Sequence, residues 1–157
     1  MSEISEKDLE ILRILQENCR LRAKEISERV ETPISTVFAK TKKMEKEGVI
    51  KAYKAVLDAA RLGVGATAFI LVSYEQQGAG GDSGPSQRDV AKQIAKLREV
   101  QEVHIIAGDW DILVKAKAKN VDAIGKLVLD KMRIIKGVKR TLTCTVFETE
   151  KETTDLL

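Results

Sequence analysis

Residues 66–74, ATAFILVSY, are almost continuously apolar, and β-branched and aromatic residues occupy the centre of the run. A strand that is apolar at every position, and not only at alternate positions, is typical of a strand buried on both faces. We therefore expect a sheet at this point of the chain. The remaining segments must supply the cover for that sheet.

The segments after this strand alternate between helical and extended patterns. A helix capped by Ser86 comes first, then two extended segments at residues 103–107 and 112–118, a helix capped by Asn120, and a last strand over residues 138–147. The resulting order is βαββαβ. This order predicts a ferredoxin-like domain, in which both helices lie on one face of an antiparallel sheet.

Such a domain leaves the second face of its sheet uncovered. Because the first strand is apolar on both sides, the bare face would form an apolar patch of the kind that monomers avoid. A second copy of the same sheet is the natural cover. We therefore predict a homodimer that forms through the C-terminal domain.

The beginning of the chain has a helical pattern instead. Ser5 and Asp8 can take up the free amides of a helix start, and the apolar residues within 9–15 form one face. A second short helix follows over residues 23–30, although Arg22 stands where a capping residue is expected. Helices this short are stable only when they share a core, so we expect them to pack together with the next helix.

The third helix has the clearest boundaries and two different faces. Thr32 can cap it, Pro33 fits its first helical position, and Gly48 suits a left-handed end. The expected buried stripe consists of Ile34, Val37, Phe38, Thr41 and Met44. The opposite face consists of Thr36, Ala39 and Lys43, flanked by Ser35, Lys40, Lys42 and Lys46.

Small hydroxyl side chains followed by lysines are what a DNA-recognition helix needs. The hydroxyl groups can reach base edges in the major groove, and the lysines can contact phosphates. A solvated surface is the alternative for a single helix, but two short helices before it favour a helix-turn-helix. We therefore predict that double-stranded DNA is bound by Ser35, Thr36, Lys40, Lys42 and Lys43.

The changes of pattern divide the chain. We predict a DNA-binding domain over residues 1–57, which includes a connecting strand at 49–57, then a junction at 58–65 and a second domain over 66–157. The glycine-rich stretch at 76–86 is expected to be a mobile surface loop. The net charge of +3 is too small to indicate nucleic-acid binding by itself, so the local lysines of the third helix carry that prediction.

Other features exclude several classes of protein. No signal peptide opens the chain and no apolar run could cross a bilayer, so we expect a cytoplasmic protein without membrane contact. Cys19 and Cys144 are expected to be reduced thiols that fill apolar space. His104, the only histidine, is expected to be an ordinary strand residue, because no partners for metal binding or catalysis surround it. We therefore expect no metal, no cofactor and no enzyme activity.

The tetrapeptide between the two middle strands has two possible roles. Gly108, Asp109, Trp110 and Asp111 have the composition of a hairpin turn, because glycine and aspartate tolerate unusual backbone angles. The two carboxylates could alternatively bind a positively charged group. Composition and spacing favour the turn, since no second acid-base group accompanies them.

Three runs of residues resemble a known family. The run DLEILRILQENCRLRAKEISERVETPISTVFAKTKKMEKEGVIKAYKAVLD resembles the N-terminal half of the leucine-responsive regulators, the Lrp/AsnC family. The runs EVQEVHIIAGDWDILVKA and GVKRTLTCTVFE resemble the C-terminal half. The similarity covers nearly the whole chain, from about Asp8 to Glu148, and its motifs occur in the family's order.

This resemblance implies an α+β protein, with a winged-helix-like helix-turn-helix joined by a strand to a ferredoxin-like βαββαβ domain. It implies a sequence-specific transcription regulator whose dimers assemble into tetramers or octamers. A small effector, usually an amino acid, would bind at a contact between dimers and change the oligomeric state or the DNA affinity. The implied effector-binding residues are Gly108, Asp109, Trp110, Asp111, Thr143, Cys144 and Thr145.

The chain departs from the family pattern at two of these predicted sites. Lys40 stands where the family usually has arginine, and Trp110 replaces a smaller aromatic ring.

Two other functions remain as alternatives. One is an architectural DNA-binding protein that does not respond to an effector. The other is an enzyme on the same scaffold that resembles siroheme decarboxylases, which the lack of a convergent acid-base set disfavours.

Overall fold

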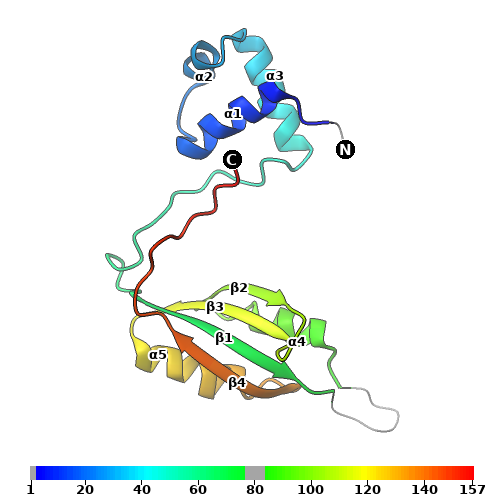
Figure 1. The fold of residues 1–157 in the computed structure, drawn as a ribbon, viewed down its shortest axis with the longest axis vertical. Helices are drawn as coiled ribbons and strands as arrows, with labels where there is room; N and C mark the ends of the chain where they lie inside the picture. The colour runs from blue at the N-terminus through cyan, green and yellow to red at the C-terminus, as the bar shows by residue number, and fades with distance from the viewer. Residues whose placement is uncertain (1–2, 77–83) are drawn as a thin grey trace. The chain divides into compact units, whose positions relative to one another are not determined.

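The computed structural model describes residues 3–76 and 84–157 (Figure 1). The described residues form two compact units. The first unit extends to Val56 and includes Lys151–Leu157, and the second unit is Leu57–Glu150. The C-terminal segment, expected as part of the second domain, therefore makes its contacts within the first unit. Most of the loop expected at residues 76–86 lies outside the described residues.

The first unit is built from α1 (Glu6–Glu17), α2 (Ala23–Arg29) and α3 (Ile34–Lys46). Each helix is too short to be stable in isolation. Together they bury one shared core, as predicted, and this core consists of Ile11, Ile26, Val30, Val37 and Met44.

The first two helices begin with different caps. The Ser5 hydroxyl accepts from the Asp8 N–H, and the Asp8 carboxylate accepts from the Ser5 N–H at 2.9 Å, which confirms the predicted start of α1. At α2 the capping side chain is missing, because Arg22 offers no acceptor. The Glu25 carboxylate compensates by accepting from the Arg22 N–H at 2.8 Å.

α3 begins one residue later than predicted. Pro33 has a ψ of 137°, so it is extended, and its carbonyl accepts the first hydrogen bonds of the helix. The prediction that Thr32 caps the helix is wrong. Its hydroxyl donates to the Val30 carbonyl at 3.0 Å, so the preceding turn uses the group that would have capped α3. Gly48 ends the helix with a φ of +74°, as predicted.

The connecting strand predicted over residues 49–57 is not formed. Residues 51–57 have no regular secondary structure, and no backbone hydrogen bond joins them to another segment of the described chain. A strand exists only through pairing with a neighbour. A single copy of the chain offers this segment no such neighbour, so the described part of the first unit is helical and has no wing.

The second unit is a four-stranded antiparallel sheet in the order β2-β3-β1-β4, with helices on one face (Figure 1). The strands are β1 (Ala66–Tyr74), β2 (Val100–Ile105), β3 (Ile112–Ala118) and β4 (Val138–Thr145). The helices are α4 (Gln87–Ile94) and α5 (Val121–Lys126), which continues as the π-helix η1 (Leu127–Met132). Ser86 and Asn120 cap α4 and α5 as predicted. The ferredoxin-like fold is confirmed.

The strand register separates two faces of this sheet. Ala68, Ile70 and Val72 alternate on the helix-covered face and are fully buried. The opposite face, called the open sheet face below, is bare in the single chain: Phe69 is 38% exposed and Leu142 is 46% exposed. It consists of Phe69, Leu71, Glu102, His104, Leu113, Lys115, Arg140, Leu142 and Cys144. β1 is therefore covered by its own chain on one side only.

A β-bulge at the beginning of β4 changes which side of the sheet its side chains lie on. Val138 pairs with Tyr74 and packs against the covered core, whereas Arg140 pairs with Ser73 on the open sheet face. Strict alternation along residues 138–147 predicts that Val138 lies on the same side as Leu142. The structure differs, because the extra residue of a bulge inverts the alternation of side chains along the strand.

Candidate DNA-reading and effector sites

α3 exposes two neighbouring rows of side chains, each made of residues four apart. All of these residues are exposed, including Ile34 at 49% and Phe38 at 59%. One row, called the polar row below after its first and last members, is Ser35, Ala39 and Lys43. The other, called the apolar row after its first two members, is Ile34, Phe38 and Lys42. The predicted burial of Ile34 and Phe38 is therefore wrong, although Val37 and Met44 are buried as expected. Helical spacing identifies the apolar side of α3, but α1 and α2 are short and cover only part of that side.

Lys40 connects α3 to the start of α1. Its Nζ donates to Asp8 Oδ1 at 2.9 Å and to the Ser5 hydroxyl at 3.1 Å. Burial raises the pKa of Asp8, but hydrogen bonds from Ser5 and Lys40 lower it by more, so the pKa lies below the ordinary aspartate value. Lys40 thus orients the recognition helix, and its predicted DNA contact remains a prediction. Thr36, one helical turn before Lys40, is half-buried.

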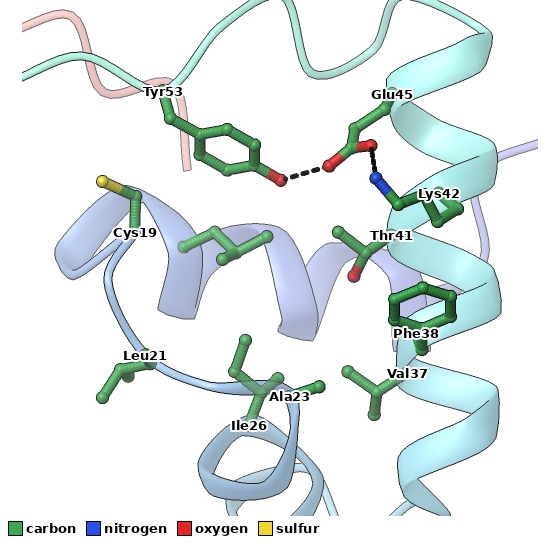
Figure 2. Close-up of a pocket in the computed structure, with 11 residues that line it drawn as sticks. Cys19, Leu21, Ala23, Ile26, Val37, Phe38, Thr41, Lys42, Glu45 and Tyr53 are labelled. Carbon is green, nitrogen blue, oxygen red and sulfur yellow. Dashed lines mark hydrogen bonds and ion pairs between the residues drawn. The ribbon is translucent and has the colours of Figure 1, made fainter.

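A cavity of about 270 Å³ lies between the three helices of the first unit (Figure 2). Its wall is mostly aliphatic, and Phe38 stands at one edge of it. At the polar end, Glu45 accepts from Lys42 Nζ at 2.7 Å and from the Tyr53 hydroxyl at 3.0 Å. Burial and then the bond to Glu45 raise the pKa of Tyr53 to about 12. Residue spacing gave no indication of this contact between α3 and the segment after it.

The tetrapeptide forms the loop between β2 and β3. Gly108 has a φ of +128°, a value that strongly favours glycine. Asp111 fixes the loop to β1: its N–H donates to the Val72 carbonyl at 3.1 Å, and its carboxylate accepts from the Tyr74 N–H at 2.8 Å. The turn interpretation is therefore correct for Asp111. Asp109 is exposed and leaves the second interpretation open.

Trp110 contacts Arg140, a residue that the sequence analysis did not identify as part of a site. The Arg140 guanidinium lies over the Trp110 ring, 4.4 Å from its centroid. Arg140 comes from the open sheet face, so a cation stacks on the aromatic ring of the residue that follows Asp109 in the chain. β3, α5 and η1 lie between Trp110 and Arg140 in the sequence, which is why local patterns could not reveal the pair.

The predicted effector residues of β4 do not form a single surface. Thr143 and Thr145 pair with Ile70 and Ala68 on the helix-covered side, whereas Cys144 lies on the open sheet face. Thr145 is opposite Ala68, four residues along β1 from the level of the tetrapeptide, which corresponds to about 13 Å. One chain therefore does not bring the two halves of the predicted site together.

The thiols differ from the expectation that they fill apolar space. Cys19 and Cys144 are both free and exposed, because Cys19 follows the end of α1 and Cys144 lies on the uncovered face of the sheet. Across residues 3–76 and 84–157, no group of three or more His, Cys, Asp or Glu side chains could hold a metal ion. No helix in that part of the chain is long and apolar enough to cross a membrane.

Comparison with known families accounts for both units. The family model of the Lrp/AsnC ligand binding domain matches residues 67–156, more than half of the chain, and a winged helix-turn-helix DNA-binding model matches residues 4–51. The chain belongs to the Lrp/AsnC family. It is therefore a transcription regulator with a DNA-binding helix-turn-helix and a ligand-binding domain.

Curated relatives of this Lrp/AsnC protein match over its full length. An uncharacterised HTH-type transcriptional regulator of Pyrococcus abyssi is 42% identical over 153 residues, which cover 97% of this chain and 99% of the relative. The HTH-type transcriptional regulator FL11 of Pyrococcus horikoshii is 37% identical over 153 residues, covering 98% of this chain and 95% of the relative. Both relatives are transcriptional regulators by name.

Solved structures give the same result. The transcriptional regulator NMB0573 of Neisseria meningitidis, solved in complex with L-Met, superposes with a TM-score of 0.88 at 31% identity, covering 99% of this chain and 97% of that chain. Escherichia coli AsnC superposes with a TM-score of 0.85 at 22% identity, covering 98% and 99%, and supports the fold alone. The predicted Lrp/AsnC resemblance and architecture are thus confirmed.

Proposed function

We propose that this regulator binds a specific double-stranded DNA sequence as a homodimer, through α3 of each copy, and that dimers assemble further. We also propose that an amino acid bound near the β2–β3 loop changes this assembly or the DNA affinity. The observation that supports the proposal best is the exposed pair of rows on α3, in a unit joined to a sheet whose bare face carries Phe69 and Leu142. Pairing of two such sheets would link two recognition helices in one dimer.

The polar row of α3 supplies the groups for DNA contact. Ser35 lies in the first turn, where recognition helices contact base edges, and Lys43 lies two turns further on. Lys42 is paired with Glu45 but its side chain remains 60% exposed, so a phosphate could compete for its ammonium group. These positions support the predicted roles of Ser35, Lys42 and Lys43. Thr36 and Lys40 would act mainly by orienting the helix.

Replacing Lys43 with alanine should weaken DNA binding to a similar extent for every sequence. Each lost phosphate contact lowers the slope of log K against log salt by about 0.9. Binding of a selected duplex, measured by fluorescence anisotropy at several salt concentrations, checks this value. The matched change Lys40→Ala should mainly destabilise the first unit, because it breaks the contact with Asp8. An unchanged salt slope in Lys43→Ala would remove this residue from the interface.

The chemistry around Trp110 fits an α-amino acid. Arg140 can pair with a carboxylate, Asp109 can accept from an ammonium group, and the indole ring offers an apolar wall. The L-Met complex of the Neisseria meningitidis regulator supports this ligand class. Because Thr145 is remote from the tetrapeptide, and Thr143 lies on the other side of the sheet from Arg140, we propose that a neighbouring copy supplies these two threonines. Cys144 would contact the ligand only from the open sheet face.

An amino acid that binds here should raise the melting temperature of the protein. At about 100 times its Kd, a ligand stabilises the folded state by roughly 2.7 kcal/mol. We expect one or more of the standard amino acids to produce this shift in differential scanning fluorimetry, and Asp109→Asn and Arg140→Met to reduce it. Arg133→Met, a change of an exposed arginine after η1, is the control that should respond as the wild type does. Equal shifts in all variants, or no shift with any amino acid, would contradict the proposed effector site.

A further inference from the structure

We propose that Ile34 and Phe38 of α3 read the C5 methyl groups of thymines in the major groove of the DNA site. The proposal rests on the proposed binding of DNA by α3, and it adds which base is recognised and by which side chains. It starts from the two residues of α3 that were expected in the core and are exposed instead.

Ile34 and Phe38 occupy the part of α3 that enters the major groove in helix-turn-helix proteins. Ile34 is the first residue of the helix and Phe38 lies one turn later, so the two side chains are neighbours on one row. They are 49% and 59% exposed. N-terminal residues of a recognition helix are those that contact base edges. An adjacent pair of large apolar side chains at this position needs an apolar partner.

Phe38 borders the interior of the first unit on one side. It lines the cavity of that unit together with Val37 and Ile26 (Figure 2). One turn further on, Lys42 pairs with Glu45, which also accepts from Tyr53, and its side chain stays 60% exposed. The apolar row therefore ends in an exposed positive charge. A phosphate contact there would direct Ile34 and Phe38 toward the bases.

Thymine is the base that offers an apolar partner in this groove. Its C5 methyl group projects into the major groove, whereas the other three bases present hydrogen-bonding atoms there. The polar row beside the pair, Ser35 and Lys43, can bond base edges and phosphates at the same time. Ala39, which lies between them, adds a further methyl group to the same surface. The two rows together predict sites that contain thymines at fixed positions.

Deoxyuridine substitution tests the proposal on the protein itself. The probe is a duplex enriched from a randomised library by the wild-type protein, with each thymidine replaced in turn by deoxyuridine, which removes only the methyl group. Burial of one methyl group contributes about 0.8 kcal/mol, or about a fourfold change in affinity. We expect at least one thymine in each half-site at which the wild-type Kd rises about threefold to tenfold. No sensitive thymine in the wild type would overturn the proposal.

Variants then assign the methyl contact to side chains. Ile34→Ala or Phe38→Ala should bring the ratio of the thymidine and deoxyuridine Kd values at the sensitive position close to one. Val49→Ala, which shortens another exposed apolar residue of the first unit, should keep the wild-type ratio.

Should Phe38→Ala fail to fold, Ile34→Ala and the wild-type scan still decide the result. The proposal is overturned if both variants keep the ratio, or if the variants change only self-association, which would show that a second copy covers the pair. A protein that enriches no duplex would instead overturn the proposed DNA binding.

Discussion

Leu142→Asp should convert the protein from a dimer to a monomer. Leu142 lies on the open sheet face beside Leu71, and it is 46% exposed in the single chain, so the change leaves the core of the chain intact. In a paired sheet the same residue would be buried, and an unpaired carboxylate at that place is strongly unfavourable. Sedimentation equilibrium should show the mass of a dimer, or of a multiple of dimers, for the wild type and the mass of one chain for the variant.

The same variant should lose most of its DNA affinity. Two linked recognition helices bind a two-part site more tightly than one helix does, by roughly 10²- to 10⁴-fold. We expect a loss in this range, with the secondary structure unchanged by circular dichroism. Leu129→Asp, on the helix layer and 57% exposed, should leave dimerisation and DNA affinity close to those of the wild type. A dimeric Leu142→Asp protein would show that the sheets do not form the interface.

Gly137→Ala should strongly destabilise the second unit. Gly137 has a φ of +97°, and a Cβ atom there would lie 2.9 Å from Val90 Cγ2 and 3.3 Å from Tyr74 Cε2. Val90 is fully buried and has no room to move. Positive-φ strain of about 1–2 kcal/mol adds to an overpacking cost of about 1–3 kcal/mol. We expect a loss of roughly 2–5 kcal/mol in the free energy of unfolding.

Thermal unfolding followed by circular dichroism checks this value. For a domain of this size, each kcal/mol corresponds to about 4–8 °C in Tm, so the shift should be at least about 8 °C. Gly63→Ala is the matched control, because Gly63 has a φ of +73° but no atom within 4 Å of the added Cβ. It should cost only the backbone strain. Similar losses in both variants would show that the contact with Val90 and Tyr74 relaxes.

Local chemistry explains why much of the fold could be predicted. Ser5, Ser86 and Asn120 cap their helices through atoms only three residues away, so the sequence contains both partners. The bounds of β1 were predicted without error because its apolar run is uniform and ends in polar residues. The βαββαβ order then restricts the topology to very few arrangements.

The parts that could not be predicted depend on contacts between distant residues. The bulge at Ser73 and Tyr74 arises from pairing with β4, and it moved Val138 into the core. The stacking of Arg140 on Trp110 depends on that register. Likewise, helical spacing could not show where the arc covered by α1 and α2 ends, so Ile34 was expected to be buried. The proposed effector site depends on Arg140 and Trp110, and the proposed thymine contact depends on Ile34.

The DNA affinity of the wild-type protein, measured with and without a saturating amino acid that stabilises it, decides whether the two units are coupled. We predict that the Kd for the selected duplex changes by about fivefold or more when the amino acid is bound. By linkage, the affinity of the protein–DNA complex for the amino acid must change by the same factor. An amino acid that binds the free protein and the DNA complex equally well, with no change in the Kd of the duplex, would contradict an effector-controlled regulator.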